Sequence, residues 1–239
     1  MKSSKRMVQN MAYTHVLFDA DDTLFDFQRA CRLAVATTVR QMTGEDIPEA
    51  FEIYERSNRR WWDRFEKGEA TMDQLSVGRF IDFTADMNLQ HIGTPEEWRD
   101  VYQANLGSFA VMVEGAEELC FRLKDRCRMF IVTNGIAAVQ RDRMSRATIR
   151  DCFEELFISQ ELGCRKPQPE YFEKVLARLG NVDKRDILVV GDSLTSDIAG
   201  SIAAGLDVCW FNPHGKDAGE LRPTYTVSRL DRIDAIVLG

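Results

Sequence analysis

The chain has 239 residues, of which 44% are hydrophobic, and a formal net charge of -7 at pH 7. This length suits one large domain or a domain with a substantial insertion, and the apolar fraction is sufficient for a sizeable core. The negative charge argues against nonspecific binding to nucleic-acid polymers, because such binding depends on a basic surface.

Cysteine usage and hydropathy exclude further classes. The six cysteines include no CxxC pair, which argues against a zinc site and a disulfide framework. No stretch approaches the roughly 20 apolar residues of a membrane span. Residues 1–11 carry basic side chains, but no apolar signal core follows them. We therefore expect a soluble cytoplasmic protein with no membrane partner and a flexible extension at 1–11, while the oligomeric state stays open.

The first predicted element is a short buried strand over His15–Phe18, and acidic residues follow it directly. Buried carboxylates need a cation, a hydrogen-bond network or a proton, because burial of an unpaired charge is costly. Asp19 and Asp21 are two residues apart and would point the same way in an extended chain. One interpretation is a site that binds a hard cation and divides nucleophilic and proton-transfer roles. The other is an acidic turn in which Asp22 and Thr23 cap a helix.

The segment that follows, 28–109, has a helical pattern throughout. Polar and apolar residues alternate with helical periodicity, and no run is typical of a strand. The helices are predicted over 29–42, 48–67, 72–87 and 95–106.

From residue 113 onward, helical and strand patterns alternate. Helices are predicted over 115–124, 137–147, 169–179 and 195–204, and strands over 129–132, 155–159, 187–190 and, as the last strand, 208–211. Such alternation indicates an α/β fold with a parallel sheet covered on both faces. Because the first strand belongs to this sheet, we predict a Rossmann-like core over 12–27 and 110–239, interrupted by a helical domain over 28–109.

Polar residues follow four of the predicted strands. In an open parallel sheet, ligands bind beyond the carboxyl ends of the strands, so residues far apart in sequence meet in one crevice. The residues expected there are Asp19, Asp21, Thr133, Asn134, Lys166, Asp192 and Asp197.

These residues suit phosphoryl transfer. Asp19 could attack phosphorus and form an aspartyl-phosphate, while Asp21 exchanges protons with the leaving group and the hydrolytic water. Asp19 and Asp192 could bind Mg²⁺, and Thr133 and Lys166 could stabilise the phosphoryl oxygens. Taken singly, each position also has a structural interpretation, as a turn, a solvated lysine or acids in the first turn of a helix.

Four segments resemble the motifs of the haloacid dehalogenase (HAD) superfamily of phosphohydrolases. The run from Asp19 to Thr23 resembles the DxDxT motif, and 132–135 resembles the second motif. Lys166 with the following proline resembles the third motif, and 191–197 resembles the fourth, GDxxxxD. Their order and spacing agree with the family over nearly the whole chain.

The resemblance implies a role for each matched residue. Asp19 would be the nucleophile and Asp21 the acid/base. A Mg²⁺ ion would be held by Asp19, the backbone carbonyl of Asp21, and Asp192, with Asp197 supporting the metal site or orienting the lysine. The substrate phosphate would be bound by Thr133, Asn134 and Lys166. The insertion at 28–109 corresponds to the family's helical C1 cap.

The same resemblance bears on the substrate. Dehalogenases of the family generally lack the second acid, so Asp21 favours a phosphatase. The segments 65–71 and 210–213 are similar to those of pyrimidine 5'-nucleotidases, which implies a nucleoside 5'-monophosphate. Trp61, Trp62 and Phe65 would then stack on the base or form cap core. The alternatives are a sugar-phosphate or phosphoglycolate phosphatase and, without catalysis, a signalling module that accepts a phosphoryl group.

Overall fold

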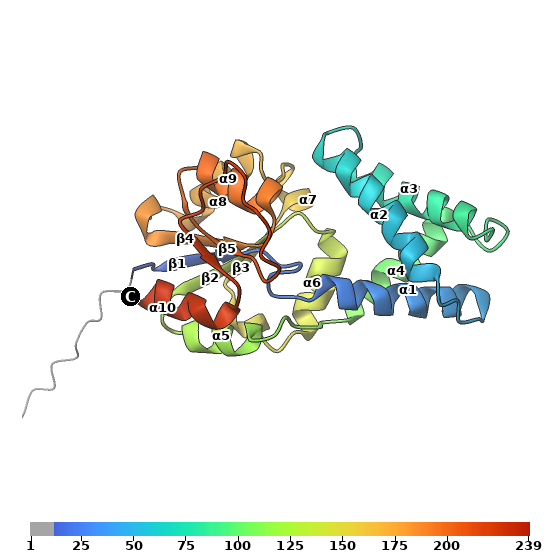
Figure 1. The fold of residues 1–239 in the computed structure, drawn as a ribbon, viewed down its shortest axis with the longest axis horizontal. Coiled ribbons are helices and arrows are strands. Elements are labelled where there is room, and N and C mark those ends of the chain that lie inside the picture. The colour runs from blue at the N-terminus through green and yellow to red at the C-terminus, as the bar shows by residue number, and fades with distance from the viewer. Residues whose placement is uncertain (1–11) are drawn as a thin grey trace, which may run out of the picture. The chain divides into compact units, whose positions relative to one another are not determined.

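A computed structural model of the chain describes residues 12–239, so the extension expected at 1–11 lies outside the described residues. The chain forms two compact units (Figure 1). The first, which we call the sheet unit, comprises, within the described residues, 12–25, Met112–Gly135 and Thr148–Gly239. The second, the helical unit, comprises Asp26–Val111 and Ile136–Ala147.

The sheet unit is built on one six-stranded sheet in the order β3-β2-β1-β4-β5-β6. Every pair of neighbouring strands is parallel, which confirms the predicted α/β fold. The strands are β1 His15–Phe18, β2 Arg128–Thr133, β3 Glu155–Ile158, β4 Ile187–Gly191, β5 Asp207–Phe211 and β6 Tyr225–Val227. The central strand β1 is short but wholly buried, because β2 and β4 flank it and helices cover both faces.

Helices pack on both faces of this sheet (Figure 1). On one face, Tyr171, Phe172 and Val175 of α8 join a core with Leu17 and Val189. On the other side, α5 and α10 pack against one another. The α-helices of this unit are α5 Ala116–Leu123, α7 Ser159–Leu162, α8 Pro169–Leu179, α9 Ala199–Ala203 and α10 Ile233–Leu238. Three single turns of 3₁₀ helix also occur, η1 Arg150–Cys152, η2 Lys184–Asp186 and η4 Leu230–Arg232.

The prediction that 208–211 is the last strand was wrong. β6 follows it and pairs in parallel with β5, with Cys209 opposite Tyr225 and Phe211 opposite Val227. β6 has only three residues and one of them, Thr226, is exposed. A strand this short at the edge of a sheet carries too little apolar periodicity to stand out in the sequence.

The single helix predicted over 195–204 consists of two segments. A π-helical turn, η3 Leu194–Ile198, comes first, and the α-helix α9 Ala199–Ala203 continues it. The side chain of Ser193 accepts a hydrogen bond from the amide of Ser196 at the start of η3. Single π turns are rare and often occur at functional sites, and this one carries Asp197.

The helical unit contains five α-helices within the described residues. They are α1 Phe27–Thr43, α2 Ala50–Glu66, α3 Met72–Asp86, α4 Pro95–Ser108 and α6 Ala137–Arg146. Tyr54, Phe80, Trp98 and Tyr102 dominate their shared core. Threonine capping boxes start α3 and α4. None of the helices in residues 12–239 combines the length and apolar character that crossing a bilayer requires.

The helical unit includes α6, which lies outside the 28–109 range expected for the helical domain. α6 packs against α4, and its Val139 lies in the aromatic core of this unit. In the sequence, α6 stands between two strands and therefore has the pattern of a helix that covers the sheet. Which core a helix packs on is decided by tertiary contacts and not by its own periodicity.

Candidate active site

The carboxyl end of β1 carries Asp19, which forms a buried ion pair with Lys166. The Lys166 Nζ lies 2.6 Å from Asp19 Oδ1, and the Lys166 side chain is 1% exposed. Burial raises the pKa of Asp19 well above its usual range, against the lowering effect of the Lys166 ammonium. Burial also lowers the pKa of Lys166, but the charges of Asp19 and Asp197 outweigh this effect and raise it. Lys166 is therefore a cation over the whole physiological range.

Lys166 is held by two further acceptors. Its Nζ donates to Asp197 Oδ1 at 2.6 Å and to the backbone carbonyl of Val132 at 2.7 Å. The other Asp197 oxygen, Oδ2, accepts from the backbone amide of Ser193 at 3.1 Å. Both oxygens of Asp197 thus have partners within the protein, which suits a residue that orients the lysine.

Gly191, the last residue of β4, makes room for Asp197. A Cβ at this glycine would lie 2.4 Å from Asp197 Oδ2 and 2.6 Å from Asp197 Cβ. Any other residue would displace the carboxylate from Lys166, since real Cβ contacts are not this short. The glycine at this position is therefore explained by packing.

Asp192 follows Gly191 and contributes the second carboxylate of the strand ends. The Thr23 hydroxyl lies 3.4 Å from Asp192 Oδ1, and the indole of Trp210 donates to the backbone carbonyl of Asp192 at 2.9 Å. Burial raises the pKa of Asp192 to about 7, with Asp197 and Asp22 adding to the effect and Lys166 opposing it. Asp192 is therefore a buried carboxyl group with other carboxylates, those of Asp197 and Asp22, close to it.

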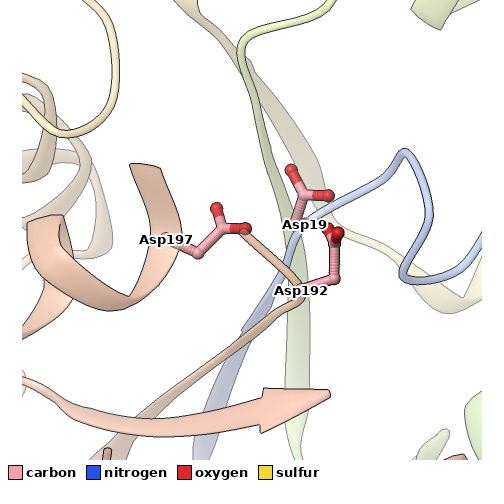
Figure 2. A group of neighbouring side chains, drawn as sticks. All are labelled: Asp19, Asp192 and Asp197. Atoms are coloured by element: carbon pink, nitrogen blue, oxygen red, sulfur yellow. The ribbon is translucent and has the colours of Figure 1, made fainter. Parts of the chain in front are cut away.

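Carboxylate oxygens of Asp19, Asp192 and Asp197 lie within 4.8 Å of one another. Figure 2 shows that the three side chains come from different segments and approach one another. When ionised, the three carboxylates exceed the single ammonium of Lys166 by two negative charges. Hard oxygen donors with this charge excess fit a divalent cation such as Mg²⁺. Because Asp197 is engaged by Lys166 and Ser193, the donors that suit this ion best are Asp19 and Asp192.

Asn134 follows β2 and uses its side chain to hold the backbone of Lys166. Its Nδ2 donates to the Lys166 carbonyl and its Oδ1 accepts from the Lys166 amide, both at 2.9 Å. The neighbouring Thr133 is 1% exposed, and its hydroxyl accepts a hydrogen bond from the amide of Gly135 at 3.0 Å. The residues after β2 therefore fix both the lysine and a hydroxyl at the edge of the sheet.

The turn after β1 does not cap a helix through Asp22 and Thr23. α1 begins at Phe27, and its N-cap is Asp26, which accepts from the amide of Arg29. Thr23 is instead fully buried and directed toward Asp192. Asp21, which is half-buried, forms an isolated bridge with Phe25, and this bridge folds the turn back on itself.

The seven residues predicted at the strand ends all lie in the sheet unit, at the carboxyl edge of the sheet. The candidate base-stacking residues Trp61, Trp62 and Phe65 lie on α2, in the helical unit. The sequence did not indicate the supporting contacts that Thr23, Gly191, Ser193 and Trp210 make with Asp192 and Asp197, and Thr23 was considered only as a helix cap and as part of the first motif. Gly191 and Ser193 fall within the fourth motif, so the motif itself was the available signal. Trp210 lies in the segment 210–213 that resembles pyrimidine 5'-nucleotidases, but its contact with Asp192 had no signal, because an indole within an apolar strand is typical of core.

Comparison with protein families identifies the chain. Residues 13–205 match the model of the haloacid dehalogenase-like hydrolases. The chain belongs to the haloacid dehalogenase-like hydrolases. This confirms the resemblance found in the four motifs, and it makes the protein a member of a hydrolase family with the expected Rossmann-like fold.

Individual members of the HAD family are similar over nearly the full length. The chain is 33% identical to the pyrimidine 5'-nucleotidase YjjG of Escherichia coli, over 95% of this chain and 99% of that protein. It is 31% identical to the pyrimidine 5'-nucleotidase PynA of Streptococcus pneumoniae, over 95% and 96%. It is also 29% identical to a glyceraldehyde 3-phosphate phosphatase of Pyrococcus abyssi, over 84% and 82%.

A solved HAD structure has the same architecture. The HAD-hydrolase YfnB of Bacillus subtilis, described as bound to magnesium, superposes with a TM-score of 0.86 at 31% identity. The match covers 94% of this chain and 98% of that chain. YfnB is thus a similar protein with a magnesium-bound structure.

Proposed function

We propose that this HAD hydrolase is a Mg²⁺-dependent phosphatase that hydrolyses nucleoside 5'-monophosphates through an aspartyl-phosphate. The observation that supports it most is Asp19, which lies at a strand end between the buried ammonium of Lys166 and the carboxylate of Asp192. The nucleotide preference is supported by the similarity to YjjG and PynA, both named as pyrimidine 5'-nucleotidases.

In the proposed reaction, Asp19 is the nucleophile. One of its oxygens is held by Lys166, so the carboxylate has a fixed orientation. An Asp19 oxygen forms a bond to phosphorus as the bond between phosphorus and the 5'-oxygen of the nucleoside breaks. Asp21 gives the departing 5'-oxygen a proton. A water molecule then attacks the aspartyl-phosphate, Asp21 takes a proton from it, and inorganic phosphate leaves with Asp19 restored.

The phosphoryl group needs positive charge and hydrogen-bond donors around its oxygens, because negative charge is spread over them in the transition state. Lys166 supplies a fixed charge, and its position is set by Asp197 and Asn134. Thr133 supplies a hydroxyl whose oxygen already accepts from Gly135, which orients it. On this basis we assign Thr133 and Lys166 to phosphate binding, with Asn134 supporting it by holding the backbone of Lys166.

Mg²⁺ would be held by Asp19, Asp192 and the backbone carbonyl of Asp21, with Asp197 in a supporting role. When bound, the ion neutralises charge on the phosphoryl oxygens. This assignment is supported by the donor chemistry and the charge excess of the cluster. It is also supported by the magnesium-bound structure of the similar protein YfnB.

A panel of phosphate esters tests the proposal. We expect UMP and dTMP to be hydrolysed with a higher kcat/KM than AMP, sugar phosphates and phosphoglycolate, and we expect EDTA to abolish turnover until Mg²⁺ is restored. A preference for glyceraldehyde 3-phosphate would favour the second candidate, a sugar-phosphate phosphatase, which the similarity to the Pyrococcus abyssi protein supports. Stable phosphorylation of Asp19 without release of phosphate would instead indicate a signalling module.

A further inference from the structure

A second lysine at the carboxyl edge of the sheet has its backbone held by an asparagine in the same manner as Lys166. Asn212 follows β5 directly, is 8% exposed and binds the backbone of Lys216 through both ends of its amide. Its Nδ2 donates to the Lys216 carbonyl and its Oδ1 accepts from the Lys216 amide, both at 2.9 Å. These are the contacts and distances that Asn134 makes with Lys166. We call the pair Asn212–Lys216 the β5 clamp.

The β5 clamp lies beside the carboxylate site. β5 pairs with β4, with Trp210 opposite Gly191, and the Trp210 indole donates to the carbonyl of Asp192. The strand end that carries the clamp is therefore adjacent to the strand end that carries Asp192. The Lys216 ammonium is close enough to oppose the rise in the pKa of Asp192.

The two lysines differ in how their charge is compensated. The Lys166 ammonium is buried and makes ion pairs with Asp19 and Asp197. Lys216 is exposed, and among residues 12–239 it takes part in no ion pair. A charge that is anchored through its backbone but not neutralised by a carboxylate is available to an anion from solution.

We propose that Lys216 is a second anion-binding residue of this site, which attracts and binds the phosphate dianion at the rim beside Asp192, and that Asn212 is its positioning residue. The proposal rests on the proposed phosphatase function. It accounts for how a dianion approaches a cluster in which the carboxylates outnumber the buried ammonium. An exposed cation beside such a cluster raises the local concentration of anions, and salt screens the effect.

The test compares Lys216→Gln and Lys216→Arg with Lys124→Gln. Lys124 is also exposed but follows α5, near the amino ends of the strands, so it is a matched control. With UMP and with p-nitrophenyl phosphate, we expect Lys216→Gln to raise KM and the inhibition constant of inorganic phosphate roughly 3- to 10-fold. We expect kcat to change little, kcat/KM to become less sensitive to salt, and Lys216→Arg to restore most of the loss.

Asn212→Ala should reproduce part of the rise in KM, since the lysine then keeps its charge but loses its anchor. Calorimetric binding of inorganic phosphate in the presence of Mg²⁺ is measured on the same variants. This measurement tests the role of Lys216 separately from the proposed phosphatase function, because phosphate can bind the site even if no ester in the panel is hydrolysed. Equal phosphate affinity in wild type, Lys216→Gln and Lys124→Gln would overturn the role of Lys216, and so would the absence of phosphate binding in wild type.

Discussion

The carboxyl and amino edges of the central sheet differ in how their charged side chains are paired and exposed. At the carboxyl edge, Asp19, Asp192 and Asp197 are brought together around one ammonium, that of Lys166, and Asp197 and Lys166 are almost wholly buried. Desolvation raises the pKa values of Asp19 and Asp192. When ionised, the three carboxylates at this edge exceed the single ammonium by two negative charges, and the raised pKa values reflect the cost of burying that charge without a further cation.

At the amino edge, the charges are matched and exposed. Arg128 makes a bidentate contact with Glu154, at 2.8 and 2.6 Å, and about half of each side chain is accessible. The hydrogen bonds from Arg128 lower the pKa of Glu154. His15 lies beside this pair, with its Nε2 3.2 Å from Arg128. In this sheet, buried carboxylates without a matching number of cations therefore mark the site, whereas paired exposed charges are ordinary surface.

Asp19→Asn should give the largest contrast between the two edges. The amide cannot act as the proposed nucleophile, so we expect kcat to fall by roughly 10⁴-fold or more. Release of phosphate from UMP measures the effect, and circular dichroism checks the fold. Glu154→Gln, at the amino edge, is the control and should keep full activity. Substantial Mg²⁺-dependent turnover in Asp19→Asn would show that another residue is the nucleophile.

Lys166→Met should affect both activity and stability. Loss of the ammonium leaves Asp19 and Asp197 buried without their cation, so we expect the free energy of unfolding to fall by about 3–5 kcal/mol. We also expect kcat to fall by roughly 10²- to 10³-fold, because the charge on the phosphoryl oxygens is no longer stabilised. Urea denaturation and steady-state kinetics measure the two effects.

Arg128→Met is the matched change at the amino edge. It breaks an exposed pair, for which a loss of about 0.2–1 kcal/mol is expected, with no change in kcat. If Lys166→Met and Arg128→Met lowered the free energy of unfolding equally, the proposed difference between the carboxyl and amino edges of the sheet would be wrong.

Gly191→Ala tests whether the close packing of Gly191 against Asp197 sets the position of the Asp197 carboxylate. The new Cβ would overlap the Asp197 side chain, so we expect a loss of about 1–3 kcal/mol in stability. Displacement of Asp197 should also misplace Lys166 and lower kcat. The control is Gly163→Ala, where no atom lies within 4 Å of the added Cβ but φ is +71°. That variant should lose stability through backbone strain alone, with unchanged kcat. An active Gly191→Ala enzyme would contradict the packing argument.

The smallest effect is expected at His15. Burial lowers the pKa of His15 and the nearby Arg128 lowers it further, so the folded protein holds the imidazole neutral. Because Arg128 can only donate, Nε2 accepts from it and Nδ1 carries the proton toward Thr14. The unfolded chain binds a proton near pH 6.5 and the folded chain only at lower pH, so stability falls as the pH falls below about 6.5.

His15→Gln should reduce the loss of stability that occurs as the pH falls below about 6.5. Urea unfolding at about pH 8 and about pH 5 gives, for each protein, the change in the free energy of unfolding with pH. The same substitution at the exposed His91 is the control. An equal slope in wild type and His15→Gln would show that His15 does not contribute to the pH dependence.

Much of the sheet could be predicted from the sequence. Strands β1, β2 and β4 are apolar runs whose burial on both faces shows directly in their residues. The carboxyl ends of parallel strands necessarily share one edge, so the position of the acidic residues followed from the pattern alone. The short edge strand β6 and the π turn η3 could not be predicted, because neither has a periodicity strong enough to identify it.

The sequence by itself determined the α/β class, the hydrolase family and the residues available for chemistry, since these depend on local patterns and motif order. Only the tertiary structure decided which atoms meet. Asp19 and Lys166 are 147 residues apart, yet their ion pair is 2.6 Å long. The packing of α6 with the aromatic core and the contacts of Asn134 and Asn212 with lysine backbones could likewise not be predicted from the sequence. Charge compensation and packing act over distance in space, and spacing along the chain does not encode that distance.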